Sequence, residues 1–157
     1  MKQAVEYRNP AAVHRPNREY SHVAVVTDPT ASLCFVSGQV GVDTNGVVHR
    51  TLDAQIEQAF VNLGSVLADV GSSLHNIVQL TTYLVDEADI DAFVARRAEM
   101  FADLFPDGYP PNTLVVVGAL ARPSLRIEVQ AIAAIPRGTP PAALDATGRS
   151  RTGPNVD

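Results

Sequence analysis

The chain has 157 residues, with 12 lysines and arginines against 17 aspartates and glutamates, so its formal net charge is −5. This length predicts a single domain, and the acidic balance leaves no basic surplus for binding a nucleic-acid backbone. Cys34 is the only cysteine, which excludes an internal disulfide and a cysteine-rich metal site and is typical of a reducing compartment.

The N-terminal half predicts strands followed by a helix. A short strand is expected near residues 3–7, and two β-branched runs at 21–27 and 32–40, joined by a proline-containing turn, predict a hairpin. Apolar residues at helical steps of four and three then predict a helix over about residues 52–70. Gly71 is placed to end this helix in the left-handed conformation.

The C-terminal half continues with a strand, a helix and two strands. The run at 77–85 predicts a central strand, and Asp86 or Asp89 can cap the helix that follows, which ends before a Pro-Asp-Gly sequence. The runs at 113–120 and 125–135 flank a short turn and predict a terminal hairpin.

The resulting order, ββαβαββ after a short N-terminal strand, predicts an α+β sheet with two helices on one face. Several strands are apolar at consecutive positions, which indicates burial on both faces, although two helices cover only one. We therefore expect a second copy of the sheet to cover the other face, in a homo-oligomer.

Residues 1–136 form the predicted domain, and residues 137–157 form a tail rich in proline and glycine. The tail has too few apolar side chains for a core, so we expect folding not to depend on it. Of a flexible tail and a strap across a neighbouring surface, the strap is favoured. The N-terminus lacks the apolar core of a signal peptide, and no apolar run approaches the roughly 20 residues that span a bilayer. These features predict a cytoplasmic protein that binds no membrane.

Glu128 is a charged residue within the last predicted strand, where it shares a face with Arg126 and Gln130. A solvated strand face is the simpler interpretation, because charged side chains are usually exposed. Burial of both sheet faces would instead desolvate Glu128 in part and raise its proton affinity, which suits a catalytic base.

Other residues that could carry chemistry give weaker signals. Gly38, after Ser37 in the second long strand, indicates either a β-bulge or close approach by a ligand or another backbone. Tyr20 is expected to be a packing residue, and Cys34 an inert thiol within an apolar strand. Four histidines show no metal-ligand spacing, namely His14, His22, His49 and His75. No phosphate-binding loop or nucleophile elbow is found.

Five segments together resemble the YjgF/RidA family of reactive-intermediate deaminases. They are SGQV, AFVNLGSVLADVG, IVQLTTYLVD, YPPNTLVVVGAL and RIEVQAIA. The resemblance extends over about residues 18–135 and implies a chorismate-mutase-like homotrimer, with a central barrel of sheets and clefts between subunits.

The resemblance also implies roles for individual residues. Glu128 matches the glutamate that activates water in the intersubunit cleft. Ser37 and Gly38 match the serine and glycine after the first hairpin, and Tyr20 matches the aromatic residue of the N-terminal loop. Leu114 stands where the family places a backbone donor.

One departure concerns the arginine that binds the substrate carboxylate, which Asn112 replaces. A neutral amide forms hydrogen bonds about half as strong as those of a guanidinium group. An imine derived from an amino acid should therefore bind weakly, unless Arg122 or Arg126 takes over the carboxylate.

The function that these features indicate is hydrolysis of a small imine or enamine to a carbonyl compound and ammonia. The substrate would depend less on a carboxylate, and the reaction would need neither metal nor organic cofactor, because an iminium carbon is already electrophilic. The alternative is a non-catalytic trimer that binds a small metabolite or a protein partner. Endoribonuclease activity, attached by name to some relatives, is disfavoured by the acidic composition.

Overall fold

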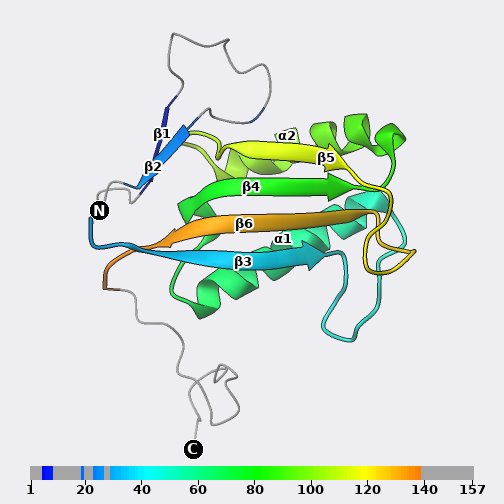
Figure 1. The fold of residues 1–157 in the computed structure, drawn as a ribbon, viewed down its shortest axis with the longest axis horizontal. Coiled ribbons are helices and arrows are strands. Elements are labelled where there is room, and N and C mark those ends of the chain that lie inside the picture. Colours follow the sequence, from blue (N-terminus) through cyan, green and yellow to red (C-terminus); the bar gives the residue numbers. More distant parts are fainter. Residues whose placement is uncertain (1–4, 9–18, 20–22, 27–28, 139–157) are drawn as a thin grey trace, which may run out of the picture.

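Four strands form a mixed sheet, and two helices pack on one of its faces (Figure 1). The computed structural model of the chain describes residues 5–8, 19, 23–26 and 29–138. In spatial order, the strands are β3 (Ser32–Val40), β6 (Ile127–Ile135), β4 (Ile77–Leu84) and β5 (Asn112–Val116). The helices are α1 (Leu52–Asp69) and α2 (Ile90–Leu104), with 3-10 turns at Leu74–Asn76 and Glu87–Asp89. The α+β class predicted from the sequence is confirmed.

Helix α1 begins and ends where the sequence predicts. The Thr51 side chain accepts a hydrogen bond from the backbone N–H of Ala54 at 3.2 Å, which satisfies one free amide of the first turn. Gly71, with φ of +77°, lies just beyond the helix and provides its left-handed termination. The predicted apolar stripe packs into the main core through Ile56, Phe60, Leu63 and Leu67.

Strands β1 (Val5–Arg8) and β2 (Val23–Val26) pair with each other in a separate antiparallel sheet. The predicted hairpin between 21–27 and 32–40 is therefore wrong. Strand β3 instead pairs with β6 along almost its whole length. This long pairing satisfies more backbone groups than the four-residue β2 could offer.

The predicted terminal hairpin is also wrong, because β6 lies between β3 and β4. Strand β5 runs parallel to β4 on its other side, with α2 as the crossover connection. Residues of β6 on the helix-facing side are fully buried, so an inner place in the sheet suits this strand. The connection 117–126 passes the end of β4 and is too long for a tight turn.

The sheet face away from the helices carries exposed apolar side chains. Phe35 is 75% exposed, Leu33 48% and Val115 38%. Single exposed apolar residues are ordinary, but several on one sheet face indicate an interaction surface. The strand sequences predict that both faces of the sheet are buried, but one copy of the chain buries only the face that the helices cover.

Tyr7 links the small sheet to β4 and gives a testable pH dependence. Its hydroxyl donates to the carbonyl of Ile77 at 2.6 Å, and burial raises the pKa of Tyr7 above its ordinary value. The folded state therefore favours the neutral phenol. Its contribution to stability is present below the unfolded pKa of about 10 and is lost as the pH rises above that value.

We expect Tyr7→Phe to flatten this dependence. Between about pH 8 and about pH 11, the urea midpoint of the wild type should fall further than that of Tyr7→Phe. An equal fall in the two proteins would show that ionisation of Tyr7 is not linked to unfolding.

Candidate functional site

The Glu128 carboxyl group lies directly over Gly38. The pairing of β3 with β6 is regular up to Val36 and again from Gln39, so Ser37 and Gly38 form a β-bulge. A β-carbon at Gly38 would overlap the carboxyl group of Glu128. Gly38 is therefore part of a β-bulge, and it is also the place where another group comes close to the backbone. That group is the Glu128 side chain of the same chain.

These residues line a pocket of about 310 Å³ on the open face of the sheet. Its described walls are Ser37, Gly38, Tyr83, Val117, Ala119, Leu120, Glu128 and Gln130. The structure therefore brings together three of the residues predicted from the sequence, and it adds Tyr83 and Gln130. Detecting those two requires the strand register, which places Tyr83 opposite Glu128.

Helix α1 fixes the end of β3 that carries the bulge. The side-chain amide of Asn62 donates to the carbonyls of Val40 and Val42, both at 2.9 Å. At Gly41, an added β-carbon would lie 2.5 Å from the Cα of Gln55, so helix and strand are in direct backbone contact there. The pocket wall formed by Gly38 therefore rests on a strand end with little freedom to move.

Gln55 connects α1 with the loops at this end of the sheet. Its amide nitrogen donates to the carbonyls of His49 at 2.8 Å and Ser124 at 2.9 Å. Its carbonyl oxygen accepts from the backbone N–H of Arg126 at 2.8 Å. Arg126 lies two residues before Glu128, so Gln55 fixes the chain that leads into the pocket.

Asn112 and Leu114 lie on the other face of the sheet. Asn112 pairs with the buried Leu80, and its side-chain oxygen accepts a hydrogen bond from Thr82 at 3.3 Å. Leu114 packs against the main core. Alternation along β4 and β6 directs Glu128 away from the helices, so one copy of the chain does not bring Asn112 and Glu128 together.

The two arginines considered for carboxylate binding have other contacts. Arg126 binds the buried carboxylate of Asp89 through two nitrogens, with an Nε to Oδ2 distance of 3.0 Å. Arg122 donates to the carbonyl of Gly46 at 3.5 Å. Neither lines the pocket of Glu128, and the described lining includes no arginine, lysine or histidine.

The remaining predictions concern residues away from this pocket. Tyr20 lies outside the described residues, as does the tail beyond residue 138. The Cys34 thiol donates to the carbonyl of Ala133 at 3.4 Å, and burial raises its pKa, as expected for an inert thiol.

Within the described ranges, no group of three His, Cys, Asp or Glu side chains could hold a metal ion. No helix among these residues is long and apolar enough to cross a membrane.

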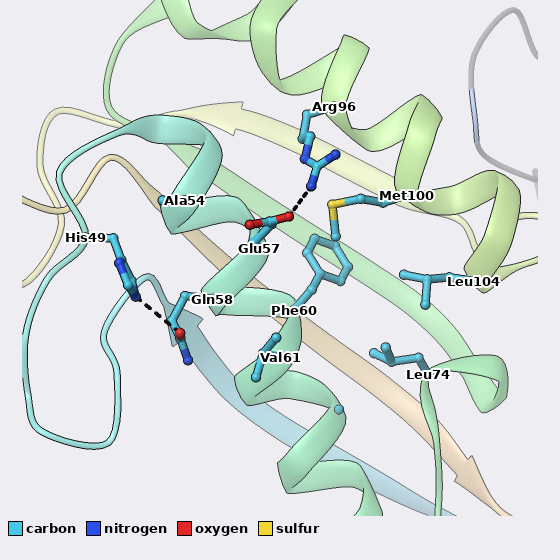
Figure 2. Close-up of a pocket in the computed structure, with 11 residues that line it drawn as sticks. His49, Ala54, Glu57, Gln58, Phe60, Val61, Leu74, Arg96, Met100 and Leu104 are labelled. Carbon is cyan, nitrogen blue, oxygen red and sulfur yellow. Dashed lines mark hydrogen bonds and ion pairs between the residues drawn. The ribbon is translucent and has the colours of Figure 1, made fainter.

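A larger hollow of about 570 Å³ lies between α1 and α2. Figure 2 shows an apolar group formed by Phe60, Leu74, Met100 and Leu104, an Arg96–Glu57 ion pair and a contact between His49 and Gln58. The sheet separates this hollow from Glu128. None of the described residues predicted for the site lines it, so we assign the candidate site to the smaller pocket.

Comparison with known proteins identifies relatives over most of the chain. The family model described as Endoribonuclease L-PSP matches residues 11–135. The RutC family protein YjgH of Escherichia coli is 31% identical over 128 residues, which cover 81% of this chain and 92% of YjgH. Human 2-iminobutanoate/2-iminopropanoate deaminase is 30% identical over 112 residues, covering 70% and 76% of the two chains. Mitochondrial protein mmf1 of Schizosaccharomyces pombe is 34% identical, and the match spans 60% of its length.

Solved structures show the same fold. A protein of unknown function from Yersinia pestis, YyfB of the conserved Rid protein family, aligns with a TM-score of 0.69 at 28% identity. This alignment covers 83% of the chain and 98% of YyfB. The structure of YjgH aligns with a TM-score of 0.60 at 33% identity, covering 75% and 85% of the two chains.

Proposed function

The chain belongs to the YjgF/RidA family, and from this premise we propose that it hydrolyses a small imine or enamine to a carbonyl compound and ammonia. The observation that carries the proposal is the position of Glu128 over Gly38 in the open-face pocket. A carboxylate held against a bulged backbone, next to a small cavity, is suited to orient a water molecule and accept its proton.

The reaction is balanced without a cofactor. The oxygen of water attacks the iminium carbon while the Glu128 carboxylate accepts one of its protons. That proton then passes to the nitrogen of the tetrahedral intermediate. The C–N bond then breaks as the Glu128 carboxylate passes the remaining hydroxyl proton to the departing ammonia, so an iminium ion and water yield a carbonyl compound and ammonium, with the carboxylate restored.

Ammonia release tests this role. We expect Glu128→Gln to lower kcat/KM by about 100-fold or more, because the amide keeps the size of the side chain but cannot accept the proton. The assay measures initial rates on enzymatically generated 2-iminobutanoate and on a carboxylate-free imine formed by a flavin amine oxidase. Glu99→Gln on α2, an exposed residue, is the matched control and should behave as wild type.

Equal rates for Glu128→Gln and wild type would contradict the proposed role of Glu128. No release above the buffer rate on either substrate would instead support a non-catalytic trimer that binds a metabolite or a protein partner. Asn112, at the position where the resemblance expects an arginine, favours that second candidate.

We also propose a homotrimer whose open sheet faces meet. The exposed apolar side chains of the open face, Phe35, Leu33 and Val115, support this assembly. Light scattering should give the mass of three chains for the wild type and a smaller mass for Phe35→Arg. Val61→Arg, at a 60% exposed valine on α1, is the control and should remain trimeric. A monomeric wild type at micromolar concentration would contradict the architecture.

Two further features concern partners and location. Endoribonuclease activity, which the family description names, gains no support from a pocket whose described lining has one charged residue, the acidic Glu128. A reducing compartment, the cytoplasm, is our proposed location, since Cys34 has no disulfide partner.

A further inference from the structure

Tyr83 and Gln130 flank Glu128 on the open face of the sheet. Tyr83 is the direct partner of Glu128 in the pairing of β4 with β6, and Thr81 is the partner of Gln130. Residues two apart on a strand project from the same face, so Glu128 and Gln130 are neighbours along β6. All three side chains line the same pocket.

The two neutral side chains also contact each other. The Tyr83 hydroxyl donates to the side-chain carbonyl of Gln130, with an O to O distance of 3.5 Å. This contact directs the oxygen of Gln130 toward Tyr83 and leaves its amide N–H groups as donors. A ligand in the pocket therefore meets neutral donors from Gln130 beside the carboxylate of Glu128.

The charge of the pocket disfavours an anionic ligand. Glu128 is its one charged residue among the described walls, and a substrate carboxylate held there would be repelled without a compensating cation. The wall formed by Val117, Ala119 and Leu120 is apolar and suits a short alkyl group. A volume of about 310 Å³ limits the ligand to a small molecule.

We propose that Tyr83 and Gln130 determine substrate specificity by binding a neutral carbonyl group, so that the substrates are small 2-imino amides or esters and not 2-imino acids. This inference rests on the proposed function, because it names the substrate class of the same site. Gln130 donates to the carbonyl oxygen of the substrate, and Tyr83 holds Gln130 in the orientation that does so. Glu128 remains directed at the imine carbon.

Binding of stable carbonyl analogues tests the inference separately from turnover. Isothermal titration calorimetry on the full chain compares 2-oxobutanamide with 2-oxobutanoate. We expect the amide to bind at least about tenfold more tightly than the acid, and Tyr83→Phe to weaken amide binding by about three- to tenfold. Tyr109→Phe removes a phenol hydroxyl outside the pocket lining and should leave amide binding unchanged.

A charge placed at Gln130 should reverse the preference. We expect Gln130→Arg to bind 2-oxobutanoate more tightly than 2-oxobutanamide, because a guanidinium pairs with the carboxylate. Val61→Arg adds the same charge to an exposed residue of α1 that lies outside the pocket lining, and it should not gain acid binding. An equal gain in both variants would overturn the assignment of Gln130.

The two proposals fail in different ways. Tighter binding of 2-oxobutanoate by the wild type, or unchanged amide binding by Tyr83→Phe, would overturn the specificity proposal even if ammonia release depends on Glu128. Selective amide binding that depends on Tyr83 would support the specificity proposal even if no imine is hydrolysed, and only the proposed reaction would then fail.

Discussion

Gly38→Ala should lower the kcat/KM for ammonia release by about 100-fold or more, nearly as much as loss of the carboxylate itself. The new β-carbon would occupy the space of the Glu128 carboxyl group, so the carboxyl group must move away from its position over residue 38. The overlapping atoms, Cγ, Cδ and Oε1 of Glu128, belong to a flexible side chain that can rotate away without shifting the backbone. We therefore expect a large loss of activity with a small change in the thermal midpoint.

Two variants separate this effect from a general loss of stability. Gly64→Ala lies within α1, where a β-carbon would meet Leu74 at an ordinary 3.6 Å, so activity should be unchanged and stability slightly higher. Gly38→Ala combined with Glu128→Ala should have a normal midpoint, because the overlapping group is gone. Full activity of Gly38→Ala would show that the position of the carboxylate over Gly38 has no catalytic importance.

Local sequence signals predict the helices well and the strand pairing poorly. The start of α1 at Leu52, its end before Gly71 and the place of β4 follow from caps, turn residues and apolar spacing. The pairing of β3 with β6 depends on contacts between residues about 100 positions apart, such as Cys34 and Ala133, which no turn residue encodes. Proximity along the chain therefore predicted two hairpins that the fold replaces with the pairing of β3 and β6.

In the candidate site, too, some residues could be predicted from local sequence and others depend on the strand register. Ser37, Gly38 and Glu128 were identifiable because a glycine and a charged residue are unusual inside apolar strands, and the family resemblance singled out the same positions. Tyr83 could not be identified in this way, because a tyrosine is an ordinary strand residue until the register places it beside Glu128. The family role of Asn112 gave no indication that its side chain would face Thr82 beneath the helices.

Gln55 is a polar residue that the helical pattern left unexplained. It is 1% exposed, and its three hydrogen bonds join α1 to the loop before it, to the 117–126 connection and to the chain entering β6. Burial of an amide costs free energy unless its donors and acceptor are satisfied, and here both are. The residue therefore stabilises the end of the sheet where Gly38 and Glu128 meet.

Gln55→Leu should lower the free energy of unfolding by about 3 kcal/mol, because it removes the three hydrogen bonds of a buried amide, at roughly 1 kcal/mol each. Urea unfolding measures the change as a lower midpoint at a constant slope. Gln58→Leu, one turn away in α1, is the matched control. It should cost less, because Gln58 is itself only half-buried and makes two such contacts, so water can replace the missing amide. Equal losses in the two variants would show that Gln55 has no special part in joining the helix to the site.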